Sequence, residues 1–81
     1  MRLTTAVREH LLSLNEGFTT SSSYDSRTQE YVRDYTIRGG QLIIREVGKT
    51  SWSDSGYDKT WTADKDETLR FLRNNLNILK K

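Results

Sequence analysis

The stretch that decides the fold is EYVRDYTIR-GG-QLIIREVGK, residues 30–49. Its two halves are rich in β-branched and aromatic residues, which is typical of strands. They flank Gly39-Gly40, and a pair of glycines favours the two-residue I′ or II′ turn of a β-hairpin. The turn also sets the register, which brings three opposite-charge pairs face to face: Glu30 with Lys49, Arg33 with Glu46, and Asp34 with Arg45. Because such cross-strand pairs stabilise an antiparallel sheet, charge and turn geometry predict the same hairpin.

Two neighbouring segments carry weaker signals. Residues 57–63 (YDKTWTA) follow the turn-forming residues 53–56 (SDSG), and this pattern predicts a third strand. If Trp52 pairs with Tyr57, Trp61 lies opposite Gly48 and covers its bare backbone. Residues 18–28 are rich in Ser and Thr, and we expect a mobile loop there, with a short edge strand as the alternative.

Residues 4–16 and 65–79 are predicted to be helices. The first is capped by Thr4 or Thr5 and ends at Gly17. Its inward stripe is Leu3, Val7, Leu11 and Leu14, with Leu12 pointing the opposite way. The second begins with a capping box of Asp64 and Glu67, and its inward stripe is Leu69, Leu72, Leu76 and Leu79. Phe71 and Ile78 are predicted on its outer side.

These elements predict an α+β fold with the order α-β-β-β-α, a three-stranded antiparallel meander with both helices packed on one face. Side chains alternate across a strand, so the sheet has two faces. The face expected to form the core carries Tyr31, Tyr35, Ile37, Leu42, Ile44, Tyr57 and Trp61, and is interrupted by Arg33 and Glu46. The other face, expected to be open to water, carries Val32, Thr36, Ile43 and Val47, framed by Asp34, Arg38 and Arg45.

Composition restricts the class of protein. The chain of 81 residues predicts a single small globular domain, residues 1–81, with a thin core. It contains no cysteine, which excludes a disulfide framework and a thiolate metal site and favours a cytoplasmic (intracellular) setting. No apolar run is long enough for a membrane span. The net charge of +2 is too balanced to indicate a polyanion partner by itself.

The residues of catalytic chemistry are sparse, so we expect no enzyme, no cofactor and no small-molecule substrate. His10 is the only histidine and lies within the apolar stripe of the first helix, which favours a structural role. The adjacent serines fall in the expected loop, where a nucleophile is poorly positioned. Asp64, Asp66 and Glu67 lack the spacing of a calcium loop and are explained by helix capping.

A basic side of the second helix favours nucleic acid as an alternative partner. Arg70, Arg73, Lys80 and Lys81 could contact phosphates. The order of elements also resembles that of the double-stranded-RNA-binding domain. That family opens its second helix with a basic Lys-Lys-x-Ala-Lys stretch, whereas residues 64–67 here read DKDE and are acidic. The resemblance is therefore one of element order alone.

A protein partner, or a homodimer, has the broadest support. The predicted contact residues are Val32, Ile43, Val47 and Arg45 on the open face, with Phe71 and Ile78 on the second helix. These residues predict a small non-catalytic binding protein, an adaptor or inhibitor that occupies a partner's surface. In size and in its mixture of acids and bases the chain is similar to phage- and plasmid-encoded inhibitors, such as anti-restriction and anti-CRISPR proteins.

Overall fold

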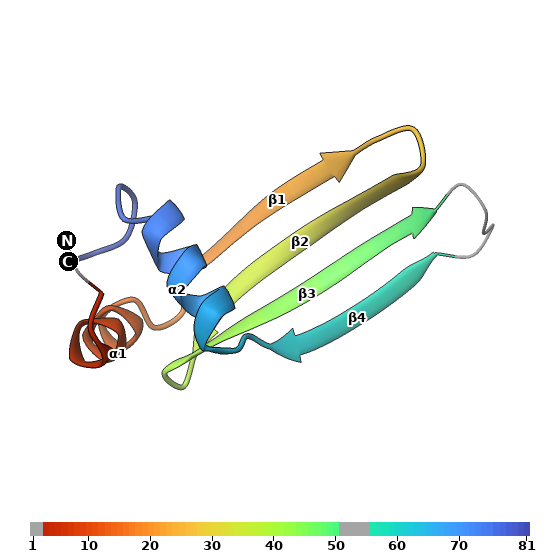
Figure 1. Ribbon diagram of the computed structural model, residues 1–81. Coiled ribbons are helices and arrows are strands. Elements are labelled where there is room, and N and C mark those ends of the chain that lie inside the picture. Colours follow the sequence, from red (N-terminus) through yellow and green to blue (C-terminus); the bar gives the residue numbers. More distant parts are fainter. Residues whose placement is uncertain (1–2, 51–55) are drawn as a thin grey trace.

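Four antiparallel strands and two short helices form the fold in the computed structural model, which describes residues 3–50 and 56–81. In chain order the elements are α1 (Thr5–Leu14), β1 (Thr19–Asp25), β2 (Gln29–Arg38), β3 (Gln41–Thr50), β4 (Tyr57–Thr62) and α2 (Lys65–Asn74). The strands form one sheet in the order β1-β2-β3-β4, so that each strand pairs with its neighbours in the sequence (Figure 1). The prediction of an α+β fold with an antiparallel sheet is confirmed.

The central hairpin has the predicted register. Gly39 and Gly40 both have positive φ, +60° and +74°, as a type I′ turn requires. Val32 pairs with Val47, Asp34 with Arg45 and Ile37 with Leu42, along two strands of ten residues each. The turn residues therefore determine which side chains share a face.

The prediction of a three-stranded sheet is wrong, because part of the expected loop at 18–28 is a strand. β1 pairs along its whole length with β2, from Thr19 opposite Thr36 to Asp25 opposite Glu30. Its side chains are polar on both faces, so the alternation of apolar and polar residues that marks a strand is absent. The observed order α-β-β-β-β-α differs from that of the double-stranded-RNA-binding domain, so the resemblance in element order does not hold.

The predicted register of β4 is wrong as well. Tyr57 lies opposite Gly48, and Trp61 lies opposite Ile44. Trp52, on which the prediction relied, lies outside the described residues. In the observed register Trp61 is close enough to α2 for its indole N–H to donate to Glu67 at 3.1 Å. This contact joins β4 to a segment that takes no part in the turn before the strand.

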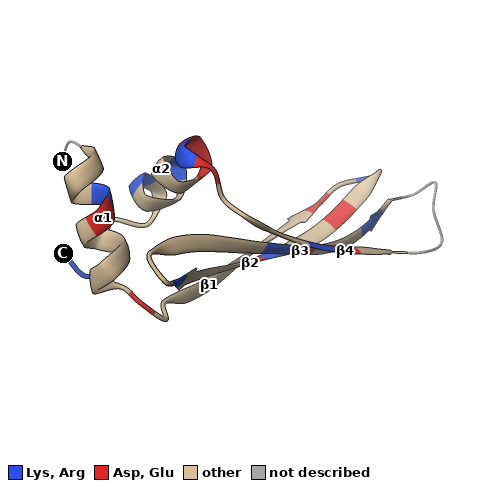
Figure 2. Ribbon diagram, turned by 90° about the horizontal axis from the view of Figure 1, so that it is seen from below, with Lys and Arg blue, Asp and Glu red and all other residues tan. Residues whose placement is uncertain are grey.

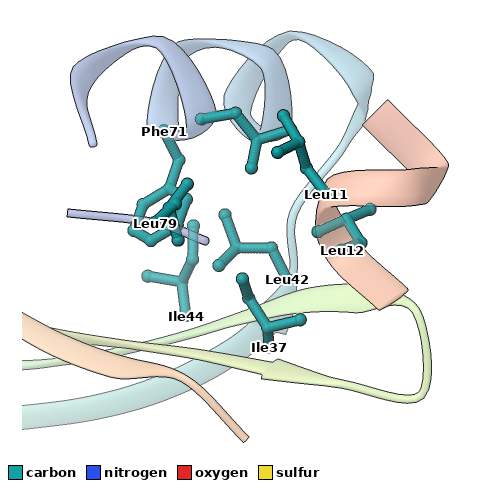
Figure 3. Close-up of a cluster of buried hydrophobic side chains, with 8 residues drawn as sticks. Leu11, Leu12, Ile37, Leu42, Ile44, Phe71 and Leu79 are labelled. Carbon is teal, nitrogen blue, oxygen red and sulfur yellow. The ribbon is translucent and has the colours of Figure 1, made fainter. Parts of the chain in front are cut away.

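The core lies at one end of the sheet, where the helices pack (Figure 3). α2 lies over one face of the sheet, and α1 crosses its end beside the β2–β3 turn (Figure 2). Leu11 and Leu12 of α1 join the same buried cluster as the sheet side chains that α2 covers. The buried apolar residues are Leu11, Leu12, Ile37, Leu42, Ile44, Phe71, Leu72 and Leu79.

The position of α1 corrects three predictions. Leu12, expected to point outward, is buried, whereas Leu14 and His10 are exposed. The inward stripe of α1 therefore runs through Leu11 and Leu12, while Leu3 and Val7 are half-buried and pack against the core as predicted. Thr4 caps α1, and its hydroxyl accepts from the Val7 N–H at 3.3 Å.

α2 is shorter than predicted and ends at Asn74. Asp64 and Glu67 form the predicted capping box at its start. Beyond Asn75, which caps the end, a turn carries Leu79 into the core and leaves Ile78 outside. Phe71, expected on the outer side, is 6% exposed and lies against Tyr35, with a ring-centroid distance of 5.0 Å. The expectation that Phe71 is available to a partner is therefore wrong.

The far half of the sheet extends away from the helices, so the molecule is elongated, 44 × 22 × 19 Å (Figure 1). Neither described helix is long and apolar enough to cross a membrane.

Candidate functional site

The open face is the side of the sheet that points away from α2 (Figure 2). At its centre Val32 of β2 and Val47 of β3 lie directly opposite each other. They are 45% and 40% exposed, and no described element covers them. Ile43 and Thr36 form the next apolar pair of the same face and are half-buried. The charged Asp34–Arg45 pair lies between them, so the open face carries two small apolar pairs on a rigid pair of strands.

Paired charges lie between and beside the two apolar pairs of the open face. Arg45 donates two hydrogen bonds to the carboxylate of Asp58, at 3.0 Å from Nε to Oδ1 and 2.6 Å from Nη2 to Oδ2. The Lys49 Nζ atom lies 3.2 Å from Oε1 of Glu30. Both signs of charge are therefore interspersed along the strands (Figure 2). Solvent-exposed pairs of this kind contribute little to stability but hold the charged groups in defined positions.

Arg45 was predicted to face Asp34, and it does so across the β2–β3 ladder. Its guanidinium nevertheless turns to Asp58 on β4, while Asp34 accepts a hydrogen bond from the Ser21 hydroxyl at 2.6 Å. The hydrogen bond from Arg45 lowers the pKa of Asp58, and Asp58 in turn raises the pKa of Arg45. A shallow hollow of about 450 Å³ on this face is lined by Asp34, Thr36, Arg38, Ile43, Arg45 and Thr60.

The structure divides the predicted contact residues into three groups. Val32, Ile43, Val47 and Arg45 come together on the open face, as predicted. Phe71 belongs to the core. Ile78 is 54% exposed, but it follows α2 and lies apart from the open face, beside the buried Leu79. The open face and Ile78 are therefore separate surfaces.

The predicted basic residues do not share one helix face. Arg70 and Arg73 lie on α2, but Lys80 and Lys81 lie beyond its end. The backbone of Lys80 is bound to the side chain of Asn15, with the Lys80 N–H donating to Oδ1 at 2.9 Å and the Lys80 carbonyl accepting from Nδ2 at 3.0 Å. The expectation of four cations along one helix is wrong because the helix ends before the lysines.

A charged cluster lies on the opposite, helix-bearing face. It contains more contacts than the Arg33–Glu46 pair that the sequence predicted. Glu46, which was expected to interrupt the core face, is 3% exposed. Its carboxylate accepts from Arg33 Nε at 2.6 Å and from the Tyr57 hydroxyl at 2.7 Å, and Lys59 Nζ lies 3.6 Å away. The Arg33 guanidinium also lies over the rings of Tyr31 and Trp61.

Opposing effects act on the pKa of Glu46 in this cluster. Burial acts to raise the pKa of Glu46, but hydrogen bonds from Tyr57 and Arg33 and the positive charges of Arg33 and Lys59 outweigh it, so the pKa is lowered. The hydrogen bond to Glu46 raises the pKa of Arg33 and also that of Tyr57. Glu46 is therefore ionised at neutral pH and holds β2, β3 and β4 together.

A hollow of about 300 Å³ lies between α2 and the part of the sheet near β1. It is lined by Thr20, Ser21, Ser22, Arg33, Tyr35, Ile44, Glu67, Arg70, Phe71, Asn74 and Asn75. Among the described residues no group of three or more His, Cys, Asp or Glu side chains could hold a metal ion. His10, the only histidine, lies on the exposed side of α1 and lines none of the hollows described above.

Comparisons with protein-family models, with curated proteins and with solved structures gave no match.

Proposed function

We propose that this chain is a small non-catalytic binding protein, an adaptor or inhibitor, that occupies the surface of a partner protein through its open face. The observation that carries the proposal is the exposed Val32–Val47 pair at the centre of a face that no described element covers. Apolar side chains presented together on regular strands are suited to docking, because they need little ordering when a partner binds.

The charges around the valines favour a protein over a polyanion. Arg45 is already paired with Asp58, and Lys49 with Glu30, so the rim carries both signs in nearly equal amounts. An apolar centre with a polar rim is the usual anatomy of a protein–protein interface. The hollow beside Arg45, Asp34 and Arg38 provides a place for a charged side chain of the partner.

Nucleic acid remains the second candidate, with less support. Arg70 and Arg73 share α2 with Asp66 and Glu67, and the two terminal lysines lie beyond the helix. Binding to phosphates weakens steeply as salt rises, whereas an interface with an apolar centre changes much less. Salt dependence of binding therefore separates the two candidates.

The test is capture of the partner by three forms of the chain: wild type, the double variant Val32→Glu/Val47→Lys, and Ile78→Lys. The double variant places opposite charges across one pair of the ladder, as Glu30 and Lys49 already do, so the sheet is expected to persist. Ile78→Lys is the matched control, since it charges an exposed apolar residue on another surface. Circular dichroism checks that all three remain folded.

We expect wild type and Ile78→Lys to retain one stoichiometric protein after nuclease treatment, and the double variant to lose it. Retention by a folded double variant would overturn the assignment of the open face. Loss of all captured material on nuclease treatment, together with a steep salt dependence, would support nucleic acid instead.

A further inference from the structure

The two edges of the sheet differ in how they are protected. β4, at one edge, carries Asp58 and Lys59 in its first half, and charged side chains discourage pairing with a further strand. β1, at the other edge, is a strand of seven residues, TTSSSYD, with no proline and no charge before Asp25. Six of these residues are exposed. β1 is therefore the edge that is open to another strand.

The hydrogen bonds at both ends of β1 show which backbone groups point outward. The Ile37 N–H donates to the Phe18 carbonyl at 3.0 Å, and the Ser26 N–H donates to the Gln29 carbonyl at 2.8 Å. Hydrogen-bonded pairs alternate along an antiparallel ladder, so the even-numbered residues between these ends bond to β2. The N–H and C=O groups of Thr19, Ser21, Ser23 and Asp25 consequently face away from the sheet.

We propose that β1 pairs antiparallel with β1 of a second copy of this chain, about a two-fold axis at Ser22. This register overlaps the whole strand and uses all the outward backbone groups. It places Ser22 opposite its own copy, Ser21 opposite Ser23, Thr20 opposite Tyr24, and Thr19 opposite Asp25. The product is one continuous sheet with an isologous interface.

The side chains of β1 are complementary to themselves in this register. No like charges meet, and opposed hydroxyl groups can form hydrogen bonds across the strands. Tyr24, 49% exposed, stacks on Tyr31 at a centroid distance of 5.1 Å and presents its outer surface. In the pair each Tyr24 lies beside Thr20 of the other copy, which lines the hollow below α2. The second copy thus extends the floor of that hollow and covers an exposed aromatic ring.

A disulfide test examines the register directly, because the chain has no cysteine of its own. Ser22 would be a non-hydrogen-bonded pair, with Cα atoms about 4.5 Å apart, which suits a disulfide. Under mild oxidation we expect Ser22→Cys to convert almost completely to a covalent dimer. Ser23→Cys, at a neighbouring residue that is also exposed, is expected to convert only by slow collision. Equal conversion of the two variants would overturn the proposed axis.

Sedimentation equilibrium then examines the association itself. Wild type is expected to reach twice the monomer mass at high micromolar concentration, and a wild-type monomer throughout would overturn the proposal. Ser21→Lys/Ser23→Lys opposes lysines across the interface and removes no backbone hydrogen bond, so we expect a folded monomer. A folded double-lysine variant that remains dimeric would show that another surface associates.

Discussion

Replacing Glu46 by Gln tests the balance of charges that holds the far half of the sheet together. The variant keeps the shape of the side chain but removes the negative charge that Arg33 and Tyr57 bind at 2.6 and 2.7 Å. A hydrogen bond to a charged group contributes about 1.5–3 kcal/mol, and a neutral one about 0.5–1.5 kcal/mol. With Arg33 partly exposed, we expect Glu46→Gln to lower the free energy of unfolding by about 2 kcal/mol.

For a domain of this size, about 2 kcal/mol corresponds to a fall in Tm of about 8–16 °C. The matched control is Glu30→Gln, since Glu30 pairs with Lys49 at 3.2 Å but is half exposed. An exposed pair contributes less than about 1 kcal/mol, so the control should shift Tm much less. Thermal unfolding followed by circular dichroism at neutral pH measures both variants.

The pH dependence gives the second part of the test. The folded-state pKa of Glu46 lies below its ordinary value of 4.5. The stabilisation by its charge is therefore present above that value and is lost as the pH falls through the lowered pKa. We expect the Tm difference between wild type and Glu46→Gln to shrink on acidification. A difference that persists in acid, or a Glu46→Gln effect no larger than that of Glu30→Gln, would refute the reasoning.

Two further predictions concern the core and the C-terminal segment. Phe71→Ala should lower the free energy of unfolding, measured in urea, by about 3–5 kcal/mol because it removes a buried ring. Ile78→Ala should change the free energy of unfolding by less than about 0.5 kcal/mol, and similar losses for the two variants would place Phe71 outside the core. Asn15→Ala removes the side chain that binds the backbone of Leu11 and Lys80, so we expect the free energy of unfolding to fall by about 1–3 kcal/mol. We also expect faster amide hydrogen exchange at Leu79 and Lys80 than in α2. Unchanged exchange at these two residues would contradict a role for Asn15 in holding the C-terminal segment.

The sequence predicted the elements whose signals are local. A type I′ turn requires positive φ at both central positions, which Gly39 and Gly40 adopt without strain, and the turn specifies the β2–β3 register. The capping box at Asp64 also depends only on residues three apart. Within the candidate site, Val32, Ile43, Val47 and Arg45 were grouped correctly because they follow from that register.

The remaining features depend on contacts between distant segments. β1 is polar on both faces, so only the presence of β2 beside it reveals a strand. The register of β4 could not be derived from a turn, and the observed one brings Trp61 to Glu67 on α2.

By itself, the sequence determined the central hairpin, the helix start at Asp64 and the composition of the open face, because alternation and turn geometry act over a few residues. Only the tertiary structure decided that Phe71 is buried, that Ile78 is separate from the open face, and that Glu46 is enclosed by three strands. Burial depends on where α1 and α2 dock against the sheet, and that docking is a property of the whole chain rather than of any one segment.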